Sequence, residues 1–468
     1  MNNVNEIIKE IDNLDTITQN KGFEFAQICS KYLRNHKTED EARRIIIHIL
    51  DHWDKLDESV RELWTDLIEA AGFYPYLEKE KNKLIFKNTA GEIRKEFHES
   101  CNLEGKYFHE EQKIHNDILN SEKNLIVSAP TSFGKSLLIE EMVASKKYKN
   151  IVVIQPTLAL LDETRKKLKK YKNDYKILVR TSQEPSDGKR NLFLLTAERV
   201  MEYPKLPQID FFVIDEFYKL STKRDDERSD VLNNAFNLLV NKHKSKFYLL
   251  GPNIDSISDG FAEKYNAKFV KTFYSLVDCQ IEDIYSEHKE KFDKPRKEKE
   301  YKEKILFDLL LELKNEQTII YCSSPARVRE LSTKFCNYLV EQNIKPQTEE
   351  LSIIEWIRNN VSDKWGVIKC LNYGIGIHDG ALQKHITSSI IHYFNENKLK
   401  YLFCTSTIIE GVNTSAKNVV FFDKTKGHRK PIDFFDCSNI KGRSGRMMVH
   451  YIGRIFNFNN PPEKEDII

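Results

Sequence analysis

The 468-residue sequence lacks any run of roughly 18 apolar residues, the length that a helix needs to cross a bilayer. Its first twelve residues also lack the apolar segment of a secretory signal. The eight cysteines are scattered, with no C-x-x-C pair and no histidine at zinc-finger spacing, so neither a metal site nor a disulfide framework is indicated. We therefore expect a cytoplasmic protein with no membrane contact.

An excess of charge of one sign is also missing. The 73 Lys and Arg residues nearly balance the 71 Asp and Glu residues, so no field over the whole molecule attracts a polyanion. Any nucleic-acid surface must then be local. Glycine (17) and proline (13) are too few for a collagenous or low-complexity chain, and at roughly 150 residues per domain the length predicts about three globular domains.

Residues 1–105 show helical periodicity and no catalytic motif. Ile45, Ile46 and Ile49 recur on one face, and Ser59 with Glu62 has the spacing of a capping box. We expect a helical accessory domain, and we regard it as the candidate docking site for a protein partner.

Beyond this domain, short apolar runs alternate with charged helical stretches in two regions, 106–280 and 305–468. This alternation is typical of βα units on a parallel sheet. The predicted strands are 125–128, 151–155, 193–195, 211–214 and 247–250, then 318–321, 401–404, 419–422 and 454–458. Residues 281–304, with 8 basic and 8 acidic residues, predict a solvated connector or surface helix. The predicted fold class is α/β, with two tandem parallel-sheet lobes after an all-α domain.

A phosphate-binding loop is predicted where strand 125–128 runs into A-P-T-S-F-G-K-S at 129–136 and then an apolar helix. The pattern G-x-x-x-x-G-K-S is met except that Ala129 replaces the first glycine. In such a loop Lys135 reaches the β- and γ-phosphate oxygens and the Ser136 hydroxyl holds Mg²⁺. The remaining predicted nucleotide-binding residues of the loop are Thr131, Ser132 and Gly134. The alternative is an ordinary helix-capping turn.

The second half of a hydrolytic site is predicted at the end of strand 211–214. Asp215 is expected to face Mg²⁺, and Glu216 is expected to polarise the attacking water. A solvated strand end is the alternative. With Lys135 upstream, the pair predicts hydrolysis of a nucleoside triphosphate.

At this point the sequence resembles the superfamily 2 helicases, in particular the Ski-like DExH branch, over about residues 108–458. The segments that carry the resemblance are Gln155–Leu160 (motif Ia), Leu195–Arg199 (Ib), Asp215–Tyr218 (II), Thr318–Ser324 (IV), Gly376–Leu382, Cys404–Asn413 (V) and Asn439–Arg446 (VI). The resemblance implies two RecA-like lobes, ATP with Mg²⁺, and single-stranded or partly duplex nucleic acid as partner. It also implies 3′ to 5′ translocation.

The resemblance assigns further residues to the nucleotide. Gln112 is similar to a glutamine that reads adenine, and Gly411 and Asn413 of motif V are expected beside the nucleotide. Arg443 and Arg446 are expected to stabilise the charge that develops on the γ-phosphate, because guanidinium groups suit that task. Surface ion pairs are the alternative for these two arginines.

The nucleic-acid backbone is expected to be held without base reading, by small hydroxyls, helix starts and cations. The candidates are Pro156, Thr157, Thr196, Arg199, Ser323, Thr405, Thr407, Lys426 and Arg429. Each hydroxyl is explained equally well as a helix cap. At residues 424–431 the resemblance implies a hairpin that acts as a wedge at a duplex junction, and Gly427 suits its turn. A plain exposed loop is the alternative. The basic run 165–170 is interpreted as the solvated face of a helix.

Some residues depart from the family pattern. Residues 250–253 read L-G-P-N where motif III usually has Ser-Ala-Thr. In addition, only 22 residues follow Arg446, so we expect either that protein partners complete the nucleic-acid channel or that the chain is a shortened version. The leading hypothesis is a nucleic-acid-dependent ATPase and helicase. The alternative is an ATP-dependent nucleic-acid sensor that gates a partner effector, as in bacterial anti-phage defence. A third hypothesis, a small-molecule kinase, would leave the second lobe unexplained. The sequence does not distinguish DNA from RNA as the bound strand.

Overall fold

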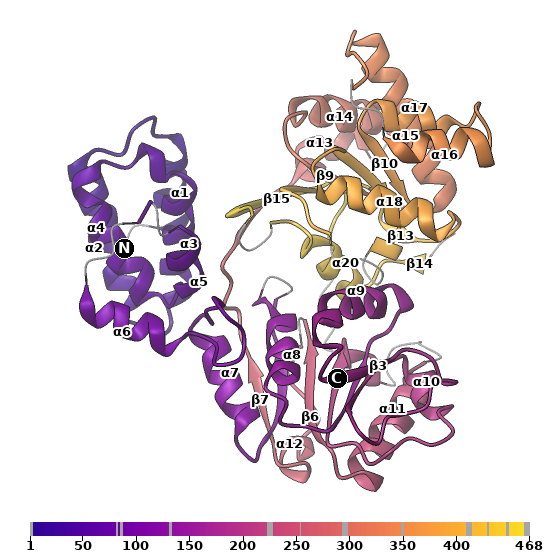
Figure 1. Ribbon diagram of the computed structural model, residues 1–468. Helices are drawn as coiled ribbons and strands as arrows, with labels where there is room; N and C mark the ends of the chain where they lie inside the picture. Colours follow the sequence, from indigo (N-terminus) through magenta and orange to yellow (C-terminus); the bar gives the residue numbers. More distant parts are fainter. Residues whose placement is uncertain are drawn as a thin grey trace. The chain divides into compact units, whose positions relative to one another are not determined.

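The predicted parallel sheets are present in a computed structural model (Figure 1). The residues that the structure describes are 3–80, 83–84, 88–130, 133–221, 228–252, 254–292, 298–347, 351–408, 414–427, 430–445 and 449–462. The chain forms two units: one contains the described residues up to Asp278 with 449–452, and the other those from Cys279 to 445 with 453–462. None of the described helices is long and apolar enough to span a membrane.

The N-terminal domain is helical. Its helices are α1 Val4–Asn13, α2 Gln19–Leu33, α3 Glu39–Asp51, α4 Glu58–Ala70, α5 Tyr74–Lys79 and α6 Thr89–Phe97. The apolar stripe of α3 is buried, as its periodicity predicts. The expected capping box is wrong: α4 begins one residue before Ser59, and the Asp57 carboxylate accepts from the Ser59 backbone N–H at 2.9 Å. Aspartate caps a helix as well as serine does.

Lobe 1 is a sheet with strand order β3-β4-β2-β5-β6-β1-β7, and its neighbouring strands pair in parallel. Its strands are β1 Asn124–Ser128, β2 Asn150–Ile154, β3 Tyr175–Leu178, β4 Arg190–Leu195, β5 Phe211–Asp215, β6 Lys246–Gly251 and β7 Ala267–Lys271. Its helices are α7 Glu110–Asn120, α8 Lys135–Ala144, α9 Leu158–Leu168, α10 Ala197–Met201, α11 Ser229–Asn237 and α12 Phe261–Lys264. The sequence did not predict β3 or β7.

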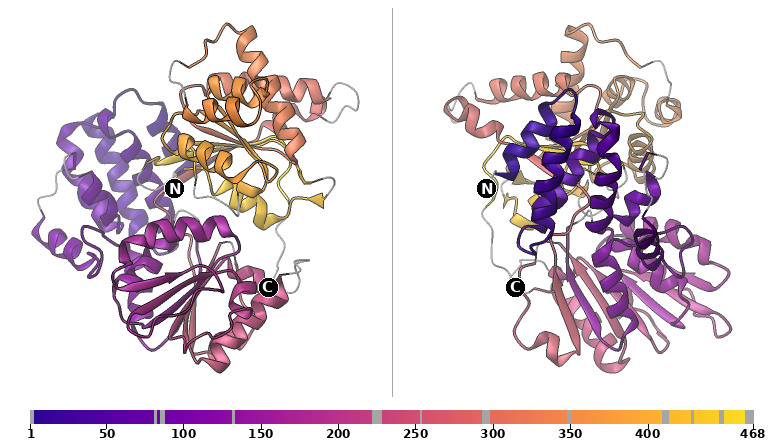
Figure 2. Two further views of the ribbon diagram at one scale, coloured as in Figure 1. Left: turned by 45° about the vertical axis from the view of Figure 1, so that its right-hand side comes forward. Right: turned by 90° about the vertical axis from the view of Figure 1, so that its left-hand side faces the viewer.

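Helices cover both faces of this sheet (Figure 2). Alternate residues of a strand point to opposite faces. Val213 of β5 packs in one core with Leu138 of α8 and Leu161 of α9, whereas its neighbour Phe212 packs edge-on against Phe236 of α11. This two-sided burial explains why the central strands are apolar throughout.

Lobe 2 is a six-stranded sheet of order β10-β11-β9-β12-β15-β8. Its strands are β8 Asp278–Glu282, β9 Thr318–Tyr321, β10 Ile375–His378, β11 Tyr401–Cys404, β12 Asn418–Phe421 and β15 Ile452–Asn457. Its helices are α13 Ile284–Phe292, α14 Glu298–Glu312, α15 Pro325–Glu341, α16 Ser352–Asn360, α17 Gly366–Asn372, α18 Lys384–Asn395 and α20 Phe434–Lys441. The pairings from β10 through β15 are parallel. The predicted fold class, two parallel-sheet lobes after an all-α domain, is confirmed.

Two local predictions for lobe 2, the hairpin at 424–431 and the segment 281–304, can be compared with the structure. The predicted hairpin is present: β13 Thr425–Lys426 pairs antiparallel with β14 Lys430–Pro431, and Gly427 has φ 63°. Of the two possibilities expected for 281–304, the structure has the surface helix: after the last two residues of β8 the segment contains α13, most of which is exposed or half-buried, and the start of α14.

The helical domain and lobe 1 share one hydrophobic core. The Tyr76 hydroxyl donates to the Leu276 carbonyl at 2.6 Å, and the Tyr274 hydroxyl donates to the Ala71 carbonyl at 3.0 Å. Helix α3 adds His48, whose ring nitrogens lie 2.7 Å from Asp12 Oδ1 and 3.0 Å from Asp278 Oδ2. The helical domain is therefore bound to lobe 1 by both apolar and charged contacts.

Candidate nucleotide and nucleic-acid site

The predicted phosphate loop joins β1 to α8. Gly134, the residue before α8, has φ 80° and ψ 31°, a left-handed conformation that glycine adopts without steric cost. Lys135 is 8% exposed, and its Nζ donates to the Ala129 carbonyl at 3.3 Å. The turn thus folds the lysine back over its own loop. Thr131 and Ser132 lie outside the described residues.

Helix α7 holds this loop through two buried side chains. Gln112 Nε2 donates to the Phe133 carbonyl at 2.9 Å, and His109 Nε2 lies 3.1 Å from the same oxygen. Burial lowers the pKa of His109 to about 3, so the ring is neutral at pH 7. The Gln112 amide is fully buried, and its adenine-reading role stays a prediction. His109 was not predicted, although H-x-x-Q at 109–112 forms the capping box of α7.

The predicted carboxylates lie at the end of β5. Asp215 Oδ2 accepts a hydrogen bond from Gln155 Nε2 at 3.2 Å, and Gln155 Oε1 in turn accepts from the Thr164 hydroxyl at 2.8 Å. Gln155 orients Asp215 and was not among the predicted site residues. The available signal was its place at the end of β2, the neighbour of β5.

Glu216 is unusual in backbone and side chain. Its φ of 62° is a left-handed conformation, which costs energy in a residue other than glycine and is common at functional sites. Its Oε2 is buried with no hydrogen-bond partner in the described part of the chain. Burial, followed by the charge of Asp215, raises the pKa of Glu216, and Lys135 partly opposes this effect. The result is a carboxylate with raised basicity beside the P-loop lysine.

The Ser136 hydroxyl lies at the start of α8. Lys167 Nζ donates to Ser136 Oγ at 3.3 Å and pairs with Glu140 at 3.0 Å, and Lys170 pairs with Glu140 at 2.5 Å. The basic run 165–170 is therefore not only a solvated face, because two of its lysines bind α8.

The predicted Mg²⁺ ligands are of the right chemical type. A serine hydroxyl and an aspartate carboxylate provide the oxygen donors that Mg²⁺ prefers. Among the described residues, no group of three or more His, Cys, Asp or Glu side chains is placed to hold a metal. Ser136 and Asp215 thus fit a cation that takes few protein ligands and completes its shell with substrate phosphates and water.

The predicted strand contacts of lobe 1 are helix caps. Thr157 caps α9 by accepting from the Leu160 N–H at 3.4 Å, and Thr196 caps α10 by accepting from the Arg199 N–H at 3.5 Å. Pro156, Thr196 and Asp215 line one pocket, at the ends of β2, β4 and β5. The N-terminus of a helix also binds phosphates, so Thr157 and Thr196 can cap their helices and still contact a nucleic-acid backbone, which stays a prediction.

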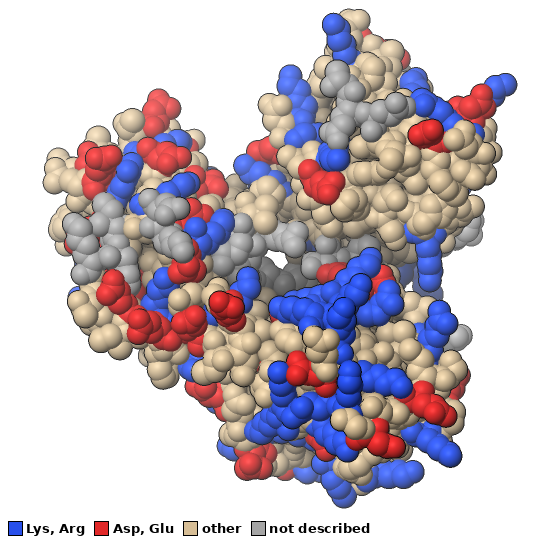
Figure 3. Space-filling model, viewed as in Figure 1, with Lys and Arg blue, Asp and Glu red and all other residues tan. Residues whose placement is uncertain are grey.

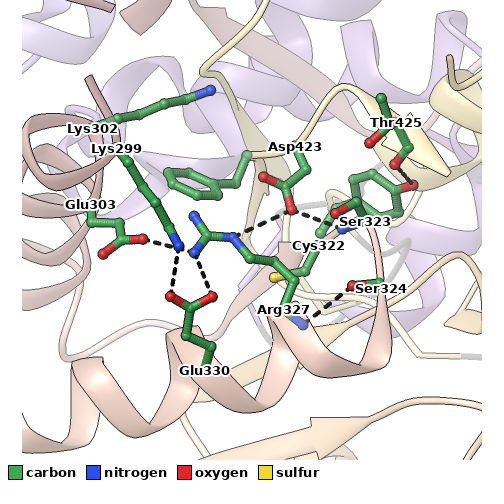
Figure 4. Close-up of polar contacts among 12 residues, drawn as sticks. Lys299, Lys302, Glu303, Cys322, Ser323, Ser324, Arg327, Glu330, Asp423 and Thr425 are labelled. Carbon is green, nitrogen blue, oxygen red and sulfur yellow. Dashed lines mark hydrogen bonds and ion pairs between the residues drawn. The ribbon is translucent and has the colours of Figure 1, made fainter. Parts of the chain in front are cut away.

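Motif IV of lobe 2 is bonded to the hairpin (Figure 4). The Ser323 N–H donates to Asp423 Oδ2 at 2.8 Å, and the Ser323 carbonyl accepts from the Gly427 N–H at 2.8 Å. Lys426 pairs with the buried Asp436 at 2.7 Å, so its charge is partly neutralised. Arg429 lies outside the described residues.

Motif V forms a chain of polar groups. Thr405 Oγ1 lies 2.9 Å from Thr407 Oγ1, which lies 3.2 Å from His378 Nδ1. Burial lowers the pKa of His378 to about 4, which keeps the ring neutral. Of motif VI, the half-buried Arg443 donates to the Thr414 carbonyl at 3.5 Å. The predicted residues Gly411, Asn413 and Arg446 lie outside the described part of the chain.

Comparison with known proteins identifies a helicase domain in each lobe. Residues 110–250 match the DEAD/DEAH box helicase family, and residues 353–458 match the helicase conserved C-terminal domain. This chain belongs to the superfamily 2 helicases. Within that superfamily, assignment to the Ski-like branch remains a prediction. Residues 1–89 match the anti-bacteriophage protein B N-terminal domain.

Several relatives cover most of this superfamily 2 chain. Anti-bacteriophage protein B of Escherichia coli K12 is 34% identical over 450 residues, which are 94% of this chain and 59% of the relative. ATP-dependent DNA helicase Hel308 of Pyrococcus horikoshii is 21% identical over 74% of this chain and 50% of the relative. Human helicase POLQ-like is 21% identical over 74% of this chain and 34% of the relative. The chain thus spans between about a third and three fifths of the length of these relatives.

Proposed function

We propose that this protein is a nucleic-acid-dependent ATPase that works as a helicase. The observation that carries the proposal is that Lys135, at the loop after β1, lies close enough to Glu216 at the end of β5 to influence its pKa, together with the neighbouring Asp215. Glu216 has a buried carboxylate oxygen that no described residue hydrogen-bonds, and its pKa is raised; both features suit a group that accepts a proton from water.

The roles of the residues follow from their chemistry. Lys135 binds the phosphate oxygens, and Glu216 accepts a proton from the attacking water. Ser136 and Asp215 hold Mg²⁺, which when bound neutralises charge on the phosphates. Lys167 donates to the Ser136 hydroxyl and pairs with Glu140, so a cation at Ser136 would favour the contact of Lys167 with Glu140 over its contact with the hydroxyl. Arg443 and Arg446 supply cationic stabilisation from lobe 2.

The substrate strand is proposed from the relatives. The Hel308 proteins are named DNA helicases, which supports DNA and unwinding here. The 3′ to 5′ direction rests on the motif resemblance. Departure from Ser-Ala-Thr at residues 250–253 leaves ATPase activity better supported than strand separation.

A second candidate is a nucleic-acid sensor in anti-phage defence that gates a partner effector and unwinds little. The match of residues 1–89 and the name of the E. coli relative favour it. In this role the helical domain, bound to lobe 1, is the surface that a protein partner contacts. We also propose a cytoplasmic location, which eight free cysteines support because disulfides are rare in reducing compartments.

The test measures ATP hydrolysis without nucleic acid, with single-stranded DNA and with single-stranded RNA, followed by displacement of a labelled strand from a partial duplex. Stimulation with displacement supports the helicase, and stimulation without displacement supports the sensor. A rate that neither nucleic acid changes would contradict both. Substrates with a 3′ or a 5′ overhang test the direction.

A further inference from the structure

A basic groove of about 650 Å³ lies along the edge of lobe 1. Six of the residues that line it are cationic: Arg165, Lys166, Lys169, Lys172, Lys176 and Lys189. None of its lining residues is Asp or Glu. Lys and Arg side chains gather over the part of lobe 1 that contains α9 (Figure 3). The groove therefore presents one sign of charge on a protein whose overall charge is nearly neutral.

Most of this charge is not neutralised by neighbouring residues. Arg165 and Lys166 share one acid, Asp162, at 2.7 and 3.1 Å. The other four lysines are exposed and make no ion pair in the described part of the chain. Residues 162–190 hold ten basic and five acidic residues, an excess of five against +2 for the whole chain. Such a local excess attracts a polyanion.

The groove meets the predicted strand-binding residues at one end. It runs beside β3, which pairs with β4 at the edge of the described sheet, and along the C-terminal half of α9. Val179, which lines the groove, accepts a hydrogen bond from Arg199 of motif Ib at 2.8 Å. The helix that Thr157 caps forms its other wall. A strand held at motif Ib would therefore lie beside the groove.

We propose that this groove binds the phosphodiester backbone of the nucleic-acid strand beyond motif Ib, as an extension of the strand-binding surface. The proposal rests on the proposed function, because it takes the strand at motif Ib as its starting point. Exposed lysine ammonium groups bind phosphates without reading bases, so the groove adds affinity and salt dependence but no sequence preference. An acidic protein segment is the competing occupant, and continuity with Arg199 favours nucleic acid.

The experiment compares charge variants of the full chain. The test variant is Lys169→Gln/Lys172→Gln/Lys176→Gln. The matched control is Lys37→Gln/Lys242→Gln/Lys345→Gln, which removes three exposed lysines elsewhere. A Lys→Arg triple at 169, 172 and 176 preserves the charge. Fluorescence anisotropy measures the binding of labelled oligothymidylate and oligouridylate over a range of salt concentrations. Each is used at about 10 and about 30 nucleotides, because a length of about 10 falls within the site size of one strand-binding domain.

We expect the test variant to bind the longer oligonucleotide about tenfold more weakly, with a salt slope smaller by about 2, because each lost contact to a single strand removes about 0.7. Binding of the shorter oligonucleotide and ATP hydrolysis without nucleic acid should not change. The control and the arginine triple should match the wild type.

If the test and control triples bound the longer oligonucleotide with equal affinity and equal salt slope, the proposal that the groove binds the strand would be overturned. The proposed function would still stand. Wild-type protein that binds neither oligonucleotide would overturn both. A polyglutamate peptide whose binding, unlike that of the strand, depends on the three lysines would overturn the proposal in favour of an acidic protein partner.

Discussion

The two lobes have the same architecture but end their strands in different chemistry. Lobe 1 ends β5 in two carboxylates and follows β1 with a buried lysine. Lobe 2 ends β10 and follows β11 with His378, Thr405 and Thr407, which are neutral. The shared fold supplies positions at strand ends, and the residues at those positions decide the function. Under the proposed function, lobe 1 supplies the groups that hydrolyse ATP, and lobe 2 supplies arginines on which the rate depends.

The largest expected effect lies in lobe 1. Lys135→Ala removes the cation that binds and stabilises the phosphates, so ATP turnover should fall by at least about 10⁴-fold. Lys123→Ala, an exposed lysine before β1, is the control and should leave the rate unchanged. A steady-state phosphate-release assay measures both variants. Turnover within tenfold of the wild type in Lys135→Ala would refute the assignment of the loop.

The corresponding change in lobe 2 should separate binding from hydrolysis. Arg443→Ala should lower the rate about 10³-fold, the lower end of the effect of an arginine that stabilises phosphoryl transfer. Binding of a labelled ATP analogue should change little, in contrast to Lys135→Ala. Arg358→Ala, exposed on α16, is the control. Loss of analogue binding without a catalytic defect would reverse the contrast between the lobes.

Glu216→Gln should lower turnover by about 10² to 10³, because the amide cannot accept a proton. Filter binding should show ATP retained on this variant, and Glu202→Gln, exposed in lobe 1, should behave as wild type. Since the pKa of Glu216 is raised, the wild-type rate should fall as the pH decreases through that raised value. A rate that is flat in acid would argue against Glu216 as the base.

The strands that the sequence predicted and those it missed differ in place. All four missed strands of the two large sheets, β3, β7, β8 and β10, are sheet edges. Central parallel strands are buried on both faces and read as continuous apolar runs. Edge strands such as β3, with the exposed Lys176, break that run. Hydrophobic runs in the sequence therefore predicted the central strands of each sheet but not its edge strands.

The site shows the same division. The positions of Lys135, Asp215 and Glu216 could be predicted because each follows an apolar strand closely in the sequence, whereas their roles stay predictions. Gln155 acts on a carboxylate sixty positions away, and His109 acts on the carbonyl of Phe133. Such partners are set by which strands and helices are neighbours, and a single sequence does not reveal that.

The hairpin should affect unwinding alone. Replacement of residues 424–430 by Gly-Ser should abolish strand displacement and leave ATP hydrolysis within about twofold, because it removes the turn and the four cations of the proposed wedge and no residue assigned to ATP. A Gly-Ser replacement of the exposed loop 343–345 is the control. If unwinding persisted and ATP hydrolysis were unchanged, the hypothesis that the hairpin acts as a wedge would be refuted.

The smallest expected effect concerns the ionic contact between the helical domain and Asp278, the residue at which the first unit ends. Burial by itself would lower the pKa of His48, but hydrogen bonds to Asp12 and Asp278 outweigh it and raise that pKa to about 9. The folded pKa lies above the unfolded value of about 6.5, so the stabilisation is complete below pH ~6.5 and is lost as the pH rises towards 9. The shift corresponds to about 3 kcal/mol at most.

Hydrogen exchange of α3 should therefore accelerate between pH 6.5 and 9 beyond the intrinsic rate, whereas exchange of β11 in lobe 2 should not. His48→Gln should remove this pH dependence and expose α3 at every pH. His392→Gln, an exposed histidine of α18, should change neither segment. Equal protection of α3 at pH 6 and pH 9 in the wild type would show that apolar packing, including Tyr76 and Tyr274, suffices to hold the helical domain on lobe 1.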